Sequence, residues 1–235
     1  MVQPTSEKFV PPVSGPQAGP MLSVSKIGRR LQDSWIWQDI SFELFAGDRL
    51  AVVGPSGTGK SLLLRTLAGL DPIQSGEISF QGTSLSNLSM PEFRAQVMYL
   101  HQKPALLEGT VESNLQQIYK LKVHRNKTYE RAKILDYLSI LGRSEKFLDR
   151  SIEQLSGGEQ QIVVCLRSLQ LSPQILLLDE PTASLDGTAT SHLEALIAQW
   201  QQSDSPKACI WTSHDPAQIE RVTTRQLTLS SSLHD

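Results

Sequence analysis

The segment Gly54-Pro55-Ser56-Gly57-Thr58-Gly59-Lys60-Ser61 decides the fold of this chain. It matches G-x-x-x-x-G-K-[ST], a loop whose backbone N–H groups surround phosphates, whose lysine reaches the outer phosphates and whose final hydroxyl binds Mg²⁺. An apolar run at 49–53 precedes it and favours a buried strand, and a glycine-free apolar run at 61–68 follows it and favours a helix. A strand, a glycine turn and a helix N-terminus form an anion site, so a phosphate-binding loop is predicted rather than a plain glycine-rich turn.

The composition excludes several classes of protein. The 235 residues include 22 basic and 24 acidic ones, a net charge of −2, and this balance gives no basic excess for a nucleic-acid partner. The longest apolar stretches, such as 175–178, are far shorter than a membrane span, and the first residues lack the pattern of a signal peptide. We therefore expect a cytoplasmic protein in which Cys165 and Cys209 are reduced, buried thiols.

The chain divides into a tail and one folded domain. Residues 1–20 are rich in proline and glycine and poor in large apolar side chains, which predicts a disordered N-terminal tail. Residues 21–235 carry the periodic segments. We expect strands near 22–27, 37–45, 49–53, 75–82, 97–100, 175–178, 208–211 and 225–229, and helices near 61–68, within 112–142, at 157–171 and at 188–202.

An acidic pair follows the most apolar of these strands. Ile175-Leu176-Leu177-Leu178 is unbroken by polar residues, as in the centre of a parallel sheet, and Asp179 and Glu180 come next. Asp179 is placed to hold Mg²⁺, and Glu180 is the candidate general base for attack of water on a phosphate. The alternative is that the two carboxylates are only a solvated strand end.

A second glycine turn precedes the helix at 157–171. In Leu155-Ser156-Gly157-Gly158-Glu159, Ser156 is a good N-cap and the two glycines let backbone N–H groups approach an anion closely. This pattern predicts a second anion-binding helix start, the alternative being a capped glycine turn without a ligand.

The segment 155–159, lying between the phosphate loop and the acidic strand end, resembles the signature of ABC-type ATPases, the nucleotide-binding subunits of membrane transporters. The resemblance spans roughly residues 22–230, with the motifs in the family's order. It implies an α/β fold: a P-loop NTPase core with a mainly parallel sheet, an antiparallel β subdomain and an inserted α-helical subdomain at about 103–170.

The same resemblance implies roles for single residues. Gln102 would sense Mg²⁺ and the attacking water, and His214 would contact the γ-phosphate and orient Glu180 or the water. Ser156, Gly157, Gly158 and Glu159 would face ATP bound to a second copy of the chain, and Asp186 would lie at that interface. Without the resemblance, a lone histidine before Asp-Pro would be read as a turn residue.

Within the family, three short segments narrow the placement. Gln102-Lys103-Pro104, residues 108–111 and Asn114-Leu115 are similar to bacterial ATP-binding subunits assigned to iron export and to plant half-transporter ATPases linked to aluminium tolerance. This similarity implies an ATPase homodimer at the inner face of the cell membrane, attached to an integral membrane permease that exports a metal ion or small solute.

One departure from the family concerns adenine. Relatives carry an aromatic residue in the first strand region that stacks on the base, whereas residues 10–34 contain no aromatic residue and Ile27 or a neighbour takes its place. Trp35 is a candidate substitute, although a core or surface role is equally open at this point.

Other functions remain open at this stage. A non-hydrolysing ATP-gated scaffold or regulator would not need Glu180, Gln102 and His214 together. A soluble ABC-type ATPase acting on DNA or ribosomes would carry tandem cassettes or a long coiled-coil insertion, and this chain shows neither. A kinase gives no reason for the 155–159 signature.

Overall fold

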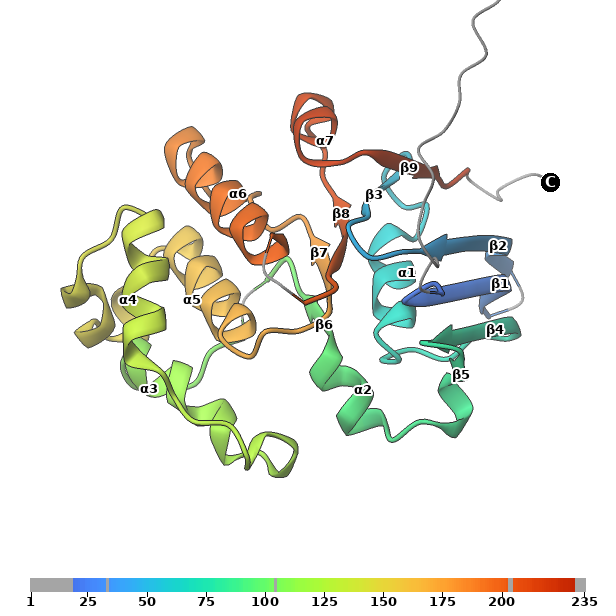
Figure 1. Cartoon of the computed structure of the whole chain (residues 1–235). Helices are drawn as coiled ribbons and strands as arrows, with labels where there is room; N and C mark the ends of the chain where they lie inside the picture. The colour runs from blue at the N-terminus through green and yellow to red at the C-terminus, as the bar shows by residue number, and fades with distance from the viewer. Residues whose placement is uncertain (1–18, 33, 104, 203–204, 231–235) are drawn as a thin grey trace, which may run out of the picture.

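The fold is built on two β-sheets (Figure 1). A computed structural model describes residues 19–32, 34–103, 105–202 and 205–230. The first sheet is parallel, in the order β6 (Val97–Leu100), β7 (Ile175–Asp179), β8 (Ala208–Thr212), β3 (Arg49–Val53) and β9 (Arg225–Thr228). The second is antiparallel, in the order β2 (Ser34–Leu44), β1 (Leu22–Leu31), β4 (Ser75–Phe80) and β5 (Thr83–Ser84). The predicted α/β fold is confirmed, while residues 1–18 of the predicted tail lie outside the described part.

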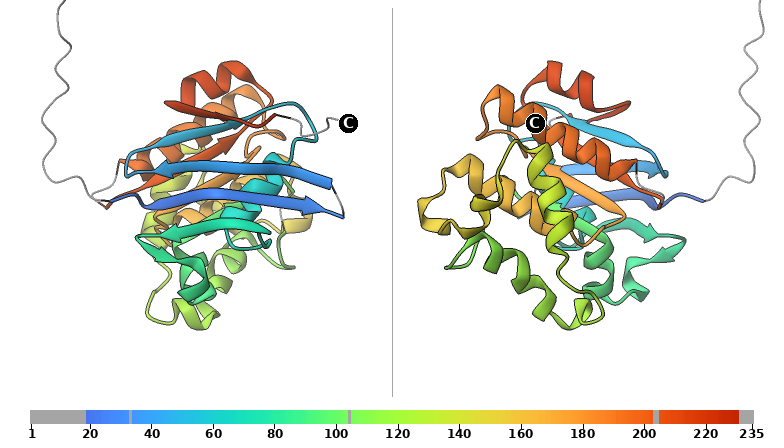
Figure 2. Two further views of the ribbon diagram at one scale, coloured as in Figure 1. Left: turned by 90° about the vertical axis from the view of Figure 1, so that its right-hand side faces the viewer. Right: turned by 60° about the vertical axis from the view of Figure 1, so that its left-hand side comes forward.

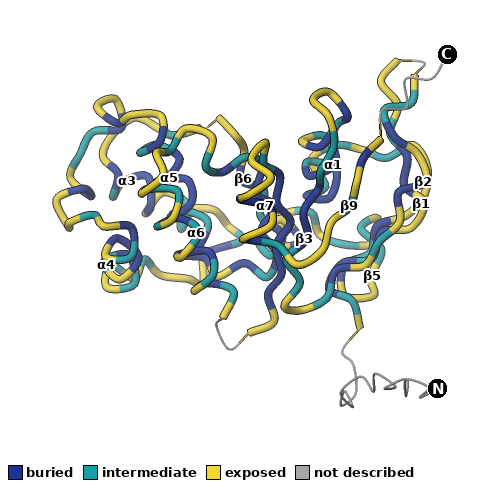
Figure 3. Tube along the Cα trace, turned by 90° about the horizontal axis from the view of Figure 1, so that it is seen from above, coloured by how far each residue is buried: buried dark blue, intermediate teal, exposed yellow. Residues whose placement is uncertain are grey.

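The helices separate into two layers around the parallel sheet. They are α1 (Lys60–Leu67), α2 (Met90–Gln96), α3 (Val111–Gln117), α4 (Arg131–Ile140), α5 (Gly157–Leu169), α6 (Gly187–Gln201) and α7 (Pro216–Val222). Helix α1 lies between the two sheets, and α3, α4, α5 and α6 lie on the other side of the parallel sheet (Figures 1 and 2). The central strands of the parallel sheet are mostly buried, whereas the edge strand β9 and the outer turns of the helices carry exposed residues (Figure 3).

Strand β7 shows why an unbroken apolar run is needed at the centre. Ile175 and Leu177 belong to the core that contains α1 and the antiparallel sheet, whereas Leu176 and Leu178 belong to the core formed with the helices α3 to α6. All four side chains are fully buried. Because successive side chains of a strand point to opposite faces, a strand covered on both faces has no position for a polar side chain.

The helical pattern predicted within 112–142 is interrupted. After α3 the chain makes two 3₁₀ turns, Ile118–Lys120 and Lys122–His124, before α4 begins. Leu121 is 55% exposed between these turns, so the apolar face of α3 does not continue through this segment. Two short helices, α2 and α7, were not predicted; each has a proline in its first turn, where proline fits a helix start as well as a loop.

Both cysteines are confirmed as free, buried thiols. Cys165 lies in α5 and Cys209 in β8, and burial raises the pKa of each thiol to about 12. A thiol with such a pKa stays protonated near neutral pH and reacts slowly, so neither cysteine has the character of a reactive site.

The structure also bears on membrane contact. None of the helices in the described ranges, 19–32, 34–103, 105–202 and 205–230, combines the length and the apolar composition of a bilayer-crossing segment.

Candidate ATP site

The phosphate loop connects β3 to α1. Gly57 and Gly59 adopt φ angles of 85° and 84°, a left-handed conformation that favours glycine. A Cβ added to Gly59 would lie 2.6 Å from Cγ2 of Ile36, so the loop also packs closely against β2. Inside the loop, Thr58 Oγ1 donates to the carbonyl of Pro55 at 2.9 Å. The packing against β2 and the internal hydrogen bond both stabilise this loop conformation.

Lys60 points back over this loop. Its Nζ donates to the carbonyls of Gly54 at 2.8 Å and of Pro55 at 3.0 Å, and the residue is only 8% exposed. The ammonium group therefore lies among the backbone groups of the loop and at the start of α1, where the helix dipole favours an anion. The predicted position of Lys60 at a phosphate site agrees with this geometry.

Asp179 is the centre of a buried hydrogen-bond cluster at the carboxyl end of β7. It is 2% exposed, and its oxygens accept from Ser61 Oγ at 2.9 Å, Tyr99 OH at 2.8 Å and Thr212 Oγ1 at 2.9 Å. Burial, together with the hydrogen bond to Asp179, raises the pKa of Tyr99, which therefore remains a donor at physiological pH. The carboxylate of Asp179 is fixed from three separate elements and stands next to the last residue of the phosphate loop.

Glu180 lies between two side chains that are distant in sequence. Gln102 Nε2 donates to Glu180 Oε2 at 2.8 Å, and Nε2 of His214 lies 2.8 Å from Glu180 Oε1. The Glu180 backbone is left-handed, with φ at 49°, and its N–H donates to the carbonyl of Thr212. A non-glycine residue in this conformation is held there by its surroundings and often lies at a functional site. The structure therefore brings together Gln102, Glu180 and His214.

The signature turn is fixed by its own first helical turn and by two arginines. Ser156 Oγ accepts from the N–H of Glu159 at 3.2 Å, and Glu159 Oε2 accepts from the N–H of Ser156 at 3.0 Å, a capping box. Arg150 and Arg143 donate to Glu159 Oε1 at 2.5 and 3.3 Å. Burial alone would raise the pKa of Glu159, but the hydrogen bonds from Arg150 and Ser156 outweigh it and lower the pKa. Glu159 thus orients the turn, and its carboxylate already has hydrogen-bond partners within its own chain.

The signature turn and the phosphate loop lie apart within one chain. Helix α1 packs in the core with the antiparallel sheet, whereas α5 packs in the core on the other side of the parallel sheet. Within the described part of the chain, Ser156 and Glu159 form hydrogen bonds with each other, and Lys60 forms hydrogen bonds with its own loop. Instead, Gly158 packs against the loop after Glu180, where an added Cβ would lie 2.5 Å from the carbonyl oxygen of Ser184.

Asp186 lies at the end of that same loop. Its Oδ1 accepts from the N–H of Ala189 at 2.8 Å and caps α6. The carboxylate is exposed at the N-terminus of α6. It stabilises the helix there as an N-cap and by its favourable interaction with the helix dipole.

Ile27 and Trp35 are the two residues that the sequence offers at the expected adenine position. Ile27 is fully buried, so its side chain is not offered to a ligand. Trp35 in β2 lies over Gly28, where an added Cβ would be 2.7 Å from a Trp35 ring carbon, and the Arg30 guanidinium lies 4.1 Å from the Trp35 ring centroid. Trp35 is half-buried, with Arg30 over its ring, and it precedes Ile36, which contacts the phosphate loop.

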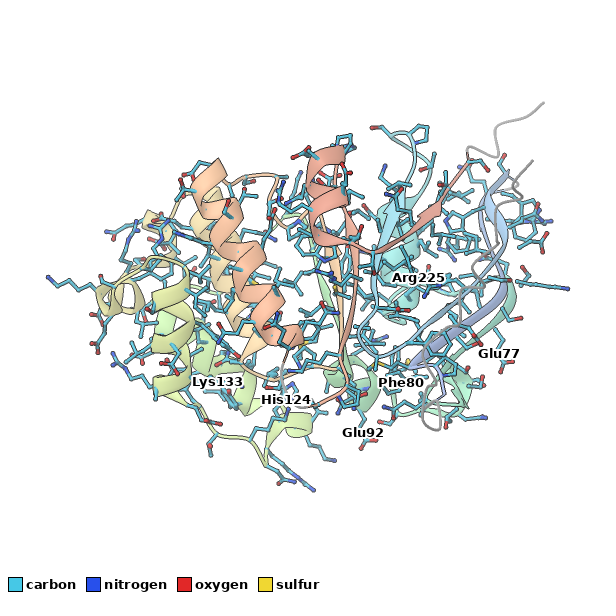
Figure 4. The ribbon with its side chains drawn as sticks, turned by 45° about the horizontal axis from the view of Figure 1, so that its top comes forward. Glu77, Phe80, Glu92, His124, Lys133 and Arg225 are labelled. Atoms are coloured by element: carbon cyan, nitrogen blue, oxygen red, sulfur yellow. The ribbon has the colours of Figure 1, made fainter. Side chains whose placement is uncertain are left out.

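His124 and His192 lie in the helical part of the chain, away from Glu180. His124 is buried in the segment between α3 and α4, at the same edge of the molecule as Lys133 (Figure 4). No group of three or more His, Cys, Asp or Glu side chains suited to a metal ion occurs within the described ranges.

Comparison with known proteins identifies the family. The family model described as ABC transporter matches residues 37–183. "Probable iron export ATP-binding protein FetA" of Escherichia coli (strain K12) is 35% identical over 203 residues, which cover 86% of this chain and 88% of that protein. "Protein STAR1" of Oryza sativa subsp. japonica is 30% identical over 207 residues, 87% of this chain and 59% of that protein.

A solved structure shares the fold. "Structure of a bacterial Atm1-family ABC exporter with ATP bound" aligns with a TM-score of 0.77 and 25% identity, over 94% of this chain and 39% of the exporter chain. The matched residues 37–183 contain both the phosphate loop and the acidic cluster around Asp179. The chain therefore belongs to the ABC transporter family as one of its ATP-binding, ATP-hydrolysing domains.

Proposed function

We propose that two copies of this chain hydrolyse ATP between them and thereby drive a separate membrane permease. The observation that carries the proposal is the placement of Glu180 between Gln102 and His214, one residue after Asp179, which is hydrogen-bonded to Ser61 of the phosphate loop. This geometry gathers a base, two orienting groups and the phosphate-binding residues at one edge of the sheet.

In this proposal the residues divide the chemistry. The loop N–H groups and Lys60 hold the triphosphate and neutralise its charge, which is most of what phosphoryl transfer needs. Glu180 accepts a proton from the attacking water while Gln102 and His214 fix the orientation of its carboxylate. His214 then contacts the γ-phosphate, a role that rests on the family resemblance.

The donor set beside the phosphate loop fits Mg²⁺. Ser61 Oγ and the carboxylate of Asp179 are the hard oxygen ligands that this ion prefers, and they lie 2.9 Å apart. When bound, Mg²⁺ would neutralise charge on the phosphate oxygens. Contact between Gln102 and the ion stays a prediction.

The shared site follows from the separation of its two halves. Since Ser156 and the phosphate loop belong to cores on opposite sides of the parallel sheet, one chain does not enclose a triphosphate by itself. A head-to-tail dimer would place Ser156, Gly157 and Gly158 of one copy on the ATP of the other, with Asp186 at the interface. ATP then favours the closed dimer by its differential affinity for that state.

The permease contact is proposed at the loop that follows Gln102, together with the helical segment at about 103–170, which we treat as a subdomain. Asn114 is 1% exposed, accepts from the N–H of Leu107 at 2.8 Å and donates to its carbonyl at 2.9 Å. This clamp holds the loop while the Leu107 side chain remains 53% exposed. The clamp would present Leu107 to a protein partner in a defined position.

Export of a metal ion or small solute is the transport reaction that we propose. Its support is the similarity to a protein named as a probable iron export ATP-binding protein. The chain would then reside in the cytoplasm, at the inner face of the cell membrane through its permease, with no nucleic-acid partner. The contact with a permease is tested by purifying the tagged chain from detergent-solubilised membranes. An integral membrane protein should be recovered with the unsubstituted chain and lost with Leu107→Glu.

The shared site predicts that ATPase activity depends on protein concentration. Specific activity should fall when the chain is diluted below the concentration at which it dimerises, because each site needs two chains. Sedimentation and turnover are measured on the same dilution series. Full activity in a dilute sample that sediments as a monomer would contradict the shared site.

A mixing experiment sharpens this prediction. Lys60→Ala and Ser156→Arg should each be inactive alone, since the first lacks a working phosphate loop and the second a working signature. When they are mixed, heterodimers contain one site built from the intact half of each chain, and activity should reappear. Failure of the mixture to hydrolyse ATP, while the two variants form heterodimers, would reject the head-to-tail arrangement.

Trp35 is proposed as the surface that holds adenine. Aromatic stacking on a base contributes about 1–3 kcal/mol in single-strand nucleic-acid binding, so Trp35→Ala should weaken ATP binding by about 5- to 150-fold. Trp35→Phe should keep most of the affinity. Leu31→Ala, at an exposed neighbouring position, is the matched control and should bind ATP normally. Unchanged binding by Trp35→Ala, measured by calorimetry, would exclude Trp35 from the base site.

A further inference from the structure

A hydrogen-bond network outside all the recognised motifs lies behind the loop that carries Glu180. The amide of Gln218 in α7 contacts the Thr182 hydroxyl with both of its polar atoms: Oε1 accepts from Thr182 Oγ1 at 3.1 Å and Nε2 lies 3.0 Å from the same oxygen. Nε2 also donates to Glu194 Oε1 of α6 at 2.8 Å. Arg221 binds both oxygens of Glu194, each at 2.8 Å. Three segments that are separate in sequence, the loop, α6 and α7, therefore meet at one amide side chain.

The chemistry fixes the orientation of that amide. A carboxylate only accepts hydrogen bonds, so the atom of Gln218 that faces Glu194 must be Nε2, the donor. Its Oε1 is then free to accept the hydroxyl hydrogen of Thr182. Gln218 is 2% exposed, so water does not readily replace either partner.

Thr182 occupies the middle of the loop between Glu180 and Asp186. The N–H of Ala183 donates to the carbonyl of Glu180 at 3.2 Å, and the N–H of Leu185 donates to the carbonyl of Thr182 at 3.0 Å. The loop thus consists of two successive turns. Its Thr182 side chain is the one that is hydrogen-bonded to α7.

Each element in the network is connected to the site. Helix α7 begins two residues after His214, and α6 begins directly after Asp186. Glu180, Thr182, His214 and Gln218 also line one cavity of about 680 Å³. Because Glu180 has a left-handed backbone, its conformation depends on surrounding contacts of this kind.

We infer that Gln218 is a positioning residue for ATP hydrolysis. It holds Thr182 so that the Glu180 carboxylate stays between Gln102 and His214, and it ties this loop to the helices that follow Asp186 and His214. It lies behind the loop and acts through Thr182 on the residues of the site. The inference rests on the proposed roles of Glu180 and His214.

The ionic part of the network explains why position 218 needs a hydrogen-bond donor. Burial would raise the pKa of Glu194, but hydrogen bonds from Arg221 and Gln218 outweigh this effect and lower it, so the carboxylate is charged at neutral pH. A second carboxylate at position 218 would meet this charge without a proton to donate.

Gln218→Glu keeps the shape and removes the donor. We expect kcat for ATP hydrolysis to fall by about 10- to 100-fold, the effect of a small misplacement of reacting groups, while KM for ATP changes little. The reciprocal double variant Gln218→Glu with Glu194→Gln restores a donor facing an acceptor and should recover most of the lost kcat. Gln226→Glu, the same substitution at an exposed position of β9, is the matched control and should behave as the unsubstituted chain.

A second readout does not depend on the role of Glu180. Hydrogen exchange of the backbone amides at 182–186 should be faster in Gln218→Glu and should slow again in the double variant. If Gln218→Glu does not fold, Thr182→Val, which removes only the hydroxyl, takes its place with the same expected loss of kcat.

Several results would overturn the inference. An unchanged kcat in Gln218→Glu or Thr182→Val rejects it, and so does a loss of kcat that the reciprocal variant fails to repair. Unaltered exchange at 182–186 rejects the link through the loop. Normal turnover of Glu180→Gln would instead reject the proposed base, and the exchange result would still stand separately.

Discussion

Glu180→Gln should bind ATP with normal affinity yet hydrolyse it about 10²- to 10⁴-fold more slowly, because the amide cannot accept the proton of the attacking water. The substitution keeps the size of the side chain and its position between Gln102 and His214. Since ATP is no longer cleaved, the nucleotide should also keep two chains together. Turnover is measured by phosphate release, and the trapped dimer by size-exclusion chromatography with ATP and Mg²⁺.

The control for this variant is the same substitution far from the site. Glu77→Gln changes an exposed carboxylate of β4, on the antiparallel sheet, and should leave turnover unchanged (Figure 4). Glu180→Gln turning over ATP at the normal rate would remove Glu180 as the base. Slow turnover without an ATP-dependent dimer would keep the base but contradict the proposed link between hydrolysis and separation of the chains.

Lys60→Ala should bind ATP about 10- to 150-fold more weakly, because a hydrogen bond to a charged group contributes about 1.5–3 kcal/mol. Lys60 Nζ now lies on the carbonyls of Gly54 and Pro55, which a bound phosphate would replace as its partners. Loss of this ammonium group leaves the triphosphate without the cation that the loop supplies.

The fold should survive this substitution. Lys60 Nζ donates to two backbone carbonyls, so its removal leaves no unpaired charge. Thermal unfolding of Lys60→Ala without nucleotide should match that of the unsubstituted chain, whereas the stabilisation by ATP should disappear. Lys146→Ala, the same substitution at an exposed lysine of the helical segment, should retain ATP-dependent stabilisation. Equal stabilisation of Lys60→Ala by ATP would show that the loop binds phosphate without its lysine.

The local motifs were the most predictable part of this chain. The phosphate loop, the N-cap at Ser156 and the apolar strand before Asp179 each depend on neighbours within a few residues. Their backbone conformations follow from glycine, from N-cap chemistry and from alternation of side chains, so spacing alone identified them. The short helices α2 and α7 were missed because a proline and a single turn of apolar residues fit a loop equally well.

The sequence by itself determined the phosphate loop and the acidic strand end, because those depend on short-range patterns, and the family resemblance implied the α/β class. Only the tertiary structure decided which side chains meet. Ser61 and Asp179 are 118 residues apart, and Tyr99, Thr212 and Gln218 have no motif that marks them. Their contacts arise where strand ends line up along one edge of the sheet and where two helices pack behind a loop, and no local pattern in the chain encodes that alignment.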